Sequence, residues 1–246
     1  MSIRISQPGN ILSLEVSPSA TVPFTPLSLP ELLTVGGGDA TAIEVNRDGT
    51  VQLIGSGIQV EEGDVVVQDI SAGQQIVIEA DGNIRTASIT SDGGRIFLNS
   101  REGEIDTSSG TLDSTAVSGD SGNIDLKAEG NITTGSLNAS SNNGDGGDIT
   151  AVSDRGSIDT SAGVVDSSSV EGKGGEVQLF ATEGSINAGD INAASSNGES
   201  GNVTLVAGSD INTENVTGNS TITYHSRFRT PECYYTKFTI SSLTAT

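Results

Sequence analysis

Large aromatic side chains and cysteines are scarce in this sequence. Its 246 residues include five Phe, three Tyr and no Trp, which argues against an ordinary globular core built on large side chains. Cys233 is the only cysteine, so an internal disulfide is excluded. No apolar run approaches the roughly 18 residues of a membrane-spanning helix, and the segment from Ile11 to Val16 is too short for a signal peptide. The core must therefore be thin, repetitive and stabilised by packing and hydrogen bonds.

Positive charge is also scarce. Eleven Lys and Arg stand against 32 Asp and Glu, a formal net charge of −21. Such a field repels the phosphates of nucleic acids and anionic lipid headgroups, so DNA and RNA partners are not expected. The charge keeps a β structure with many strand edges soluble.

Isoleucine, valine and leucine recur at regular intervals between Gly-rich turns. A first apolar column, at steps of 20 to 28 residues, contains Ile76, Ile96, Ile124, Ile149, Val177 and Val203. Two residues further along each segment lies a second column, with Ile78, Leu98, Leu126, Ala151, Leu179 and Leu205. Because every second residue is apolar, these segments are predicted to be strands that point one face inward.

A second strand is predicted eight or nine residues after each first one. Its inward residues are Ile84, Ile105, Ile132, Ile158, Ile186 and Ile211, and a Gly for which we expect a positive φ precedes most of them: Gly82, Gly103, Gly130, Gly156 and Gly184. Two residues on, a threonine column is expected to link its hydroxyls from rung to rung: Thr86, Thr107, Thr134, Thr160 and Thr213. A third apolar position follows, at Ile89, Leu112, Leu137, Val165, Ile191 and Val216.

Three short strands per unit predict an all-β fold, a right-handed parallel β-helix with coils of about 25 residues. The repeat also has a two-coil period of about 53 residues, for example from Ile96 to Ile149. We attribute it to an alternation of long and short third turns, which would make loops of like length protrude on alternate rungs.

The repeat domain is predicted over residues 36–221. Ile43, Val51 and Ile58 continue the eight-residue step upstream with Gly49 at a corner, so a looser coil or pair of coils is expected over residues 36–72. Residues 1–35 hold five of the six prolines and are interpreted as a cap or linker. Residues 222–246 contain all three Tyr and the only His, and form either a cap or the out-of-frame end of a longer repeat.

Two sequence features invite a catalytic interpretation, and neither supports it. The segment GDSG at residues 119–122 is like the nucleophile segment of trypsin-like proteases, but the only candidate base, His225, lies far downstream in the tail. Asp106 and Asp159 occupy matching IDT segments, as a glycan-cleaving β-helix would require, yet they should lie two rungs apart, about 10 Å, without an aromatic platform. We therefore expect no enzymatic activity and no catalytic residues.

Two oxygen-rich turns are candidates for calcium, at residues 120–125 (DSGNID) and 143–148 (NGDGGD). Neither has EF-hand spacing, and the tandem nonapeptide of calcium-bound β-rolls is absent. The prediction is no cofactor and no metal site, with weak surface calcium as the open alternative and ordinary turn chemistry as the simpler explanation.

One outward-facing strip is apolar. The position before the small inward residue reads Lys127, then Val152, Phe180 and Val206 on successive rungs. A contiguous apolar strip of this kind marks a contact. The strip is either an interaction site for a partner or the surface that the aromatic tail covers.

The recurring pattern G-G/N-x-I-x-L-x-A-x-x-G-x-I-x-T, as in GNIDLKAEGNITTGSLNAS and GGEVQLFATEGSINAGDINAAS, resembles the repeats of filamentous haemagglutinin-like exoproteins of bacteria over about residues 73–216. The resemblance implies export by two-partner secretion and a role as an adhesin or as a shaft carrying a terminal module. It also implies a location outside the cell or on the outer-membrane surface, although the sequence shows no leader. Expected partners are a cell-surface protein or glycan, or neighbouring segments of a longer exoprotein. The rival hypothesis is a glycan-binding or glycan-cleaving β-helix.

Overall fold

The computed structural model describes the backbone of residues 2–7, 10–15, 43–45, 51–53, 56–60, 63–67, 69–73, 75–224 and 238–244. Side chains are described between residues 63 and 219, apart from positions 68 and 74. Within these ranges the chain forms strands and no helix. It is a parallel β-solenoid with coils of about 26 residues, which confirms the predicted fold class.

The first strand of every coil joins one eight-stranded sheet, and all its neighbours are parallel. The inward isoleucines stack in register, as in the pairing of Ile96 with Ile124 and of Ile124 with Ile149. The strands are β5 (Ser56–Val60), β8 (Ile76–Ala80), β11 (Ile96–Ser100), β13 (Ile124–Ala128), β15 (Ile149–Ser153), β18 (Val177–Ala181), β21 (Asn202–Ala207) and β23 (Asn219–Tyr224).

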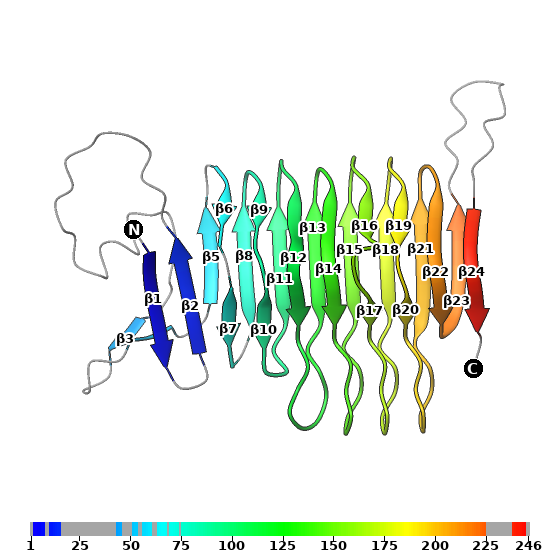
Figure 1. Cartoon of the computed structure of the whole chain (residues 1–246), viewed down its shortest axis with the longest axis horizontal. Helices are drawn as coiled ribbons and strands as arrows, with labels where there is room; N and C mark the ends of the chain where they lie inside the picture. The colour runs from blue at the N-terminus through cyan, green and yellow to red at the C-terminus, as the bar shows by residue number, and fades with distance from the viewer. Residues whose placement is uncertain are drawn as a thin grey trace.

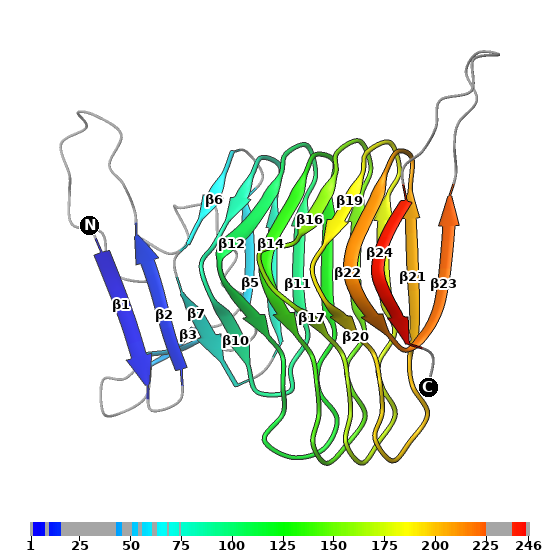
Figure 2. The same cartoon turned by 45° about the vertical axis from the view of Figure 1, so that its right-hand side comes forward.

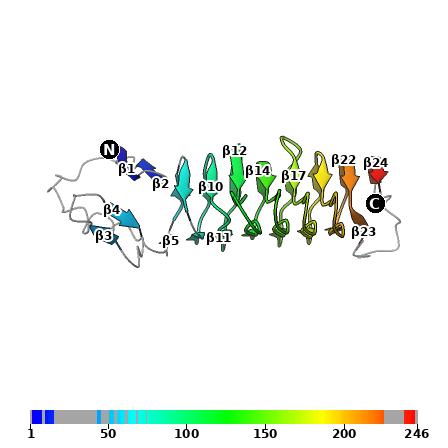
Figure 3. The same ribbon diagram turned by 90° about the horizontal axis from the view of Figure 1, so that it is seen from below.

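The second and third strands of each coil form the opposite layer (Figures 1 and 3). Together with β1 (Ser2–Gln7) and β2 (Asn10–Glu15) they make up a 14-stranded sheet. The second strands are β6 (Val65–Val66), β9 (Ile84–Arg85), β16 (Ile158–Thr160), β19 (Ile186–Ala188) and β24 (Phe238–Thr244). The third strands are β7 (Ile70–Ala72), β10 (Ile89–Ser91), β17 (Val165–Asp166) and β20 (Ile191–Asn192). Three longer strands run through both positions: β12 (Ile105–Asp113), β14 (Ile132–Asn138) and β22 (Ile211–Thr217).

The two ends of the stack differ from the repeat. At the first coil, β1 (Ser2–Gln7) and β2 (Asn10–Glu15) pair antiparallel, and β2 lies antiparallel to β7. At the other end, β23 lies parallel to β21, and β24 lies parallel to β22. The stack therefore continues past residue 221, where the repeat domain was expected to end, while residues 225–237 lie outside the described part of the chain.

The expected looser coil over residues 36–72 is correct only from Ser56 onward, where β5, β6 and β7 pair in parallel with the next coil. Upstream of it, β3 (Ile43–Val45) and β4 (Val51–Leu53) pair antiparallel, so Ile43 and Val51 do not belong to a coil.

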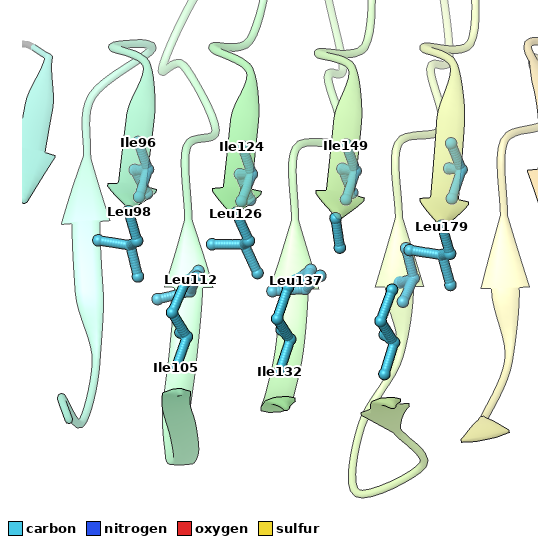
Figure 4. Close-up of a cluster of buried hydrophobic side chains, with 14 of the residues drawn as sticks. Ile96, Leu98, Ile105, Leu112, Ile124, Leu126, Ile132, Leu137, Ile149 and Leu179 are labelled. Atoms are coloured by element: carbon cyan, nitrogen blue, oxygen red, sulfur yellow. The ribbon is translucent and has the colours of Figure 1, made fainter. Parts of the chain in front are cut away.

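The interior consists of stacked aliphatic columns. The twelve residues that the sequence places at the starts of the first and second strands, from Ile76 to Val203 and from Ile84 to Ile211, are at most 1% exposed. Figure 4 shows Ile96, Ile124 and Ile149 stacked on one sheet, with Ile105 and Ile132 facing them from the other. Residues between them along each strand face outward, as the alternating burial of β8, β11 and β18 shows.

The corner glycines correct one prediction. Positive φ occurs at Gly63, Gly93, Gly119 and Gly218, and at none of the five glycines that precede the second strands. Their role is close stacking instead. A Cβ added to Gly103 would lie 2.6 Å from the carbonyl carbon of Gly82, and one added to Gly130 would lie 3.0 Å from the carbonyl oxygen of Gly103. Each corner thus rests on the backbone of the corner in the preceding coil, where a side chain has no room.

The threonine column is buried, but its hydroxyls do not link the rungs. Thr86 and Thr134 donate to the carbonyl oxygens of the residues that follow them, at 3.3 and 3.0 Å. The hydroxyls of Thr107, Thr160 and Thr213 have no hydrogen-bond partner. Stacked threonines that share a rotamer hold their oxygens about 4.8 Å apart, beyond hydrogen-bond reach, so a column of this kind cannot form the expected ladder.

Replacement of Thr107 by valine is expected to raise the free energy of unfolding by about 1 kcal/mol. The hydroxyl is fully buried without a partner, and the methyl group that replaces it has nearly the same shape. Thr134→Val is the matched control, expected to lower the free energy by about 1 kcal/mol because the bond to Gly135 is lost. Urea titration measures both. Destabilisation by both variants would show that Thr107 has a partner, such as a buried water.

The third turns project from four successive coils, as the lower loops in Figures 1 and 2 show. Ten residues separate β12 from β13, β14 from β15 and β17 from β18, and nine separate β20 from β21. The expected alternation of long and short third turns is therefore wrong. The two-coil period arises at the second corner, where six residues lie between Ile105 and Leu112 but only four lie between Ile132 and Leu137. The extra residues form an irregularity in β12 between Thr107 and Thr111. We call the four projecting turns, residues 114–123, 139–148, 167–176 and 193–201, the loop stack.

Each turn of the loop stack is closed at its base by a hydrogen bond between two backbone groups. Gly122 N donates to Ser114 O at 2.9 Å, and the pairs Gly147 with Ala139, Gly175 with Ser167 and Gly201 with Ala193 repeat the bond at 2.7–2.8 Å. Isolated parallel bridges from Ser141 to Ser169 and from Ser169 to Ser195 join neighbouring turns. The closed bases keep the turns outside the stacked core.

Candidate functional site

The two matching carboxylates lie where the sequence predicts, two rungs apart on the outward side of the second strands. Asp106 is opposite Thr133, and Thr133 is opposite Asp159. Each carboxylate accepts hydrogen bonds from the serine two residues ahead: Ser108 N and Oγ at 3.1 and 2.6 Å, and Ser161 N and Oγ at 3.0 and 2.6 Å. The two groups therefore build the turns that follow their own strands.

The electrostatics of Asp159 agree with this role. Partial burial raises the pKa of its carboxyl, but the hydrogen bonds from Ser161, together with one from Asn187, lower it more, so the pKa lies below its ordinary value. A general acid in glycoside hydrolysis needs a carboxyl whose pKa is raised. Asp159 is instead held in the ionised form.

The GDSG segment lies in the first turn of the loop stack. Ser121 is buried, its hydroxyl donates to Ser140 O at 2.6 Å and accepts from Ala116 N at 3.3 Å. His225 lies outside the described residues, so no contact with it is described. The described bonds of Ser121 serve to hold its turn against the next coil.

The oxygen-rich turns use their carboxylates to join coils. Asp120 Oδ1 accepts from Asp145 N at 2.8 Å, and Asp145 Oδ1 accepts from Lys173 N at 2.7 Å. Asp148 Oδ1 accepts from Glu176 N at 2.8 Å in the same manner. Among the residues with described side chains, no three His, Cys, Asp or Glu come together as a metal site would require.

A similar ladder, which the sequence analysis missed, lies at the first corner. Asp64 Oδ1 accepts from Asn83 N at 2.8 Å, and Asn83 Oδ1 accepts from Glu104 N at 2.9 Å. Asn131 Oδ1 accepts from Ser157 N at 2.9 Å, and Ser157 Oγ accepts from Ser185 N at 3.0 Å. The signal was present as a polar residue directly before each second-strand isoleucine. The donor to Asp64 lowers the pKa of that carboxyl, with a further contribution from the Asn83 side chain.

The outward face of the eight-stranded sheet carries apolar side chains, unlike the polar corners and turns. Val152 lies opposite Phe180, and Phe180 lies opposite Val206, so the predicted strip forms across β15, β18 and β21 with Lys127 opposite Val152. The three apolar side chains are half-buried. The suggested cover, the aromatic tail, falls largely in residues 225–237 outside the described residues, while β23 adds a rung beside the strip and places Thr223 opposite Val206.

A second apolar pair on this face was missed. Val77 and Phe97 are neighbours on β8 and β11, at the other outward position of the strand. The guanidinium of Arg95 lies 4.7 Å from the ring centre of Phe97 and pairs with Asp125 at 2.5 Å. Phe97 and Phe180 are the only aromatic residues between positions 63 and 219, and both point outward from this sheet. The sequence signal for this pair was an apolar residue directly after Ile76 and Ile96 of the first apolar column.

Comparison of the chain with family models, curated protein sequences and solved structures finds no match. In the part of the chain that the structure describes, no helix is long and apolar enough to cross a membrane.

Proposed function

We propose that this chain is a non-catalytic shaft or adhesin segment of a secreted, cell-surface protein like the filamentous haemagglutinins. Its work would be to extend a binding or effector module and to present its turns for adhesion. The observation that carries the proposal is the use of polar side chains: carboxylates, amides and hydroxyls of successive coils bond to the backbone of the next coil, as at Asp120, Asn83 and Ser157.

The stacking pattern supports a mechanical role. Parallel register continues from β5 to β23 in one sheet without a break, over a continuous aliphatic interior. Ion pairs add links between consecutive coils, from Arg101 to Asp81 at 2.8 Å and from Arg155 to Glu129 at 2.9 Å. Every coil thus adds length and contacts its neighbours along the axis, which is the architecture of a rod.

The glycan-cleaving alternative gains nothing from the carboxylates. Asp106 and Asp159 each bind their own turn, and Thr133 stands between them. The partners we propose are a cell-surface protein or glycan and the adjoining segments of a longer exoprotein, outside a bacterial cell.

Pulling the full chain between two marker domains by atomic force microscopy tests the shaft. Because each coil contacts only its neighbours, we expect a series of rupture steps, each releasing the contour length of one coil of about 26 residues, or about 9 nm. A reducing-end assay on a panel of bacterial and host polysaccharides runs in parallel. Extension of the whole chain in a single step without coil-sized intermediates, or release of new reducing ends by the chain, would contradict the proposal.

A further inference from the structure

Twelve side chains make up the outer face of the eight-stranded sheet between β8 and β21. They form two columns, one for each outward position of a strand. The first column contains Val77, Phe97, Asp125, Thr150, Gln178 and Thr204, and the second contains Glu79, Asn99, Lys127, Val152, Phe180 and Val206.

This face carries little of the charge of the protein. Only Glu79, Asp125 and Lys127 are charged among the twelve residues, and the Arg95 guanidinium lies over Phe97 and pairs with Asp125, whereas the whole chain has a net charge of −21. Repulsion between two copies of the chain is therefore weak where these faces meet. Five of the twelve side chains are apolar, and they include the two outward phenylalanines.

The apolar side chains follow a diagonal line across the two columns. Val77 and Phe97 occupy the first column at the end nearer β8, and Val152, Phe180 and Val206 occupy the second column at the end nearer β21. At β13 the line passes between Asp125 and Lys127, two residues apart on the same strand. Polar residues fill the remaining corners, Glu79 and Asn99 on one side and Thr150, Gln178 and Thr204 on the other.

We propose that a second copy of this chain docks on this face, related to the first by a two-fold axis that runs along the diagonal. Such an axis places each apolar side chain against its own equivalents, as an isologous interface requires. It also brings Lys127 of each copy to Asp125 of the other, where the ammonium joins the pair that Asp125 already makes with Arg95. The polar corners then lie at the rim, where interfaces are solvated.

The size of the face sets the strength of the dimer. Six strands about 4.8 Å apart, with five residues of about 3.3 Å each, present roughly 450 Å² per copy, or about 900 Å² in all. Stable complexes bury more than this, and weak, reversible ones bury about as much. The expected dissociation constant is therefore in the range of tens of micromolar. Two sheets pack well face to face when their twists agree, and the sheet of a second copy has the same twist as the first.

Sedimentation velocity of the full chain from about 1 to 300 μM, at 0.15 M salt to screen the long-range repulsion, measures the dimer. Phe180→Asp and Lys127→Glu are each expected to raise the dissociation constant at least tenfold, the first by placing a carboxylate on the axis and the second by opposing Asp125. Val117→Asp is the matched control, because Val117 is 86% exposed in the loop stack, away from the face. It should dimerise like the unaltered chain, and circular dichroism melts confirm that all variants fold.

A crosslink tests the axis itself, in a Cys233→Ser background. Val152→Cys, beside the axis, should give a disulfide-linked dimer on mild oxidation, whereas Thr204→Cys, in a polar corner away from the axis, should not. Monomers alone at 300 μM would overturn the proposal. So would a dimer that resists Phe180→Asp and Lys127→Glu, or equal crosslinking through both cysteines.

Discussion

Replacement of Leu126 by alanine is expected to lower the free energy of unfolding by about 4 kcal/mol, near the upper end for buried leucines. Leu126 is 1% exposed and stacks between Leu98 and Ala151. Because Ala151 is already small, a second alanine beside it would leave two adjacent rungs unfilled in the column. The cavity would be large, and parallel strands held by their ladders cannot close around it.

Guanidinium chloride titration followed by circular dichroism measures the loss. Val117→Ala is the control, since Val117 is 86% exposed and its truncation should change the free energy by less than about 0.5 kcal/mol. A loss below about 1.5 kcal/mol for Leu126→Ala would mean that the core relaxes into the space, and that the stacked columns are less rigid than their register implies.

Replacement of Gly156 by alanine is expected to cost about 3 kcal/mol although the substitution adds one methyl group. A Cβ at this position would strike the backbone of Gly130 and the amide of Asn131 in the preceding coil. Backbone atoms on both coils are fixed by parallel ladders, so neither can move aside without breaking hydrogen bonds. The φ of Gly156 is not positive, so the cost is steric.

Gly119→Ala separates the two reasons for a glycine. Gly119 has a φ of +87° and nothing within 4 Å of an added Cβ, so only backbone strain of about 1 kcal/mol should appear. Thermal melts of both variants report the comparison. If Gly119→Ala were the more damaging of the two, the close stacking of corners would not be the reason that glycine recurs there.

The strand positions were predictable because burial forces a period of two. The first strands β8, β11, β13, β15 and β18 begin at the isoleucine or valine that must point inward, and the second strands of these coils begin at another isoleucine eight or nine residues on. Aliphatic side chains at these positions are buried in the interior between the two sheets, so the spacing of the aliphatic residues along the sequence was enough to identify the coil.

The corners were harder to predict because glycine has more than one use. Gly156 and Gly119 both occur in turns, yet one is needed for contact between coils and the other for its φ. Sequence spacing does not separate these reasons, because the contact depends on the coil beneath. The second corner presented a similar problem: two extra residues after Thr107 change the coil length in the same way as a longer third turn would.

Only part of the apolar surface on the eight-stranded sheet was predicted, because its residues occupy two different outward positions of the strands. Val152, Phe180 and Val206 share one outward position on consecutive rungs, so a single column revealed them. Val77 and Phe97 occupy the other outward position, beside Asp125, and only the two columns together show one diagonal. The oxygen-rich turns were interpreted as ordinary turn chemistry, although their side chains bond across coils, because hydrogen bonds between residues about 25 apart leave no local pattern.

The closed bases of the loop stack determine where this protein can gain sequence. Residues inserted beside the 86% exposed Val117, for example, would lengthen a turn whose two ends are already joined by the hydrogen bond from Gly122 N to Ser114 O, so β12 and β13 would keep their register. Doubling such a turn costs only about 0.6 kcal/mol of closure entropy. An insertion at the first corner would instead separate glycines that touch. A foreign peptide grafted for display is therefore expected to be tolerated at the exposed tip of this first turn and rejected at the first corner.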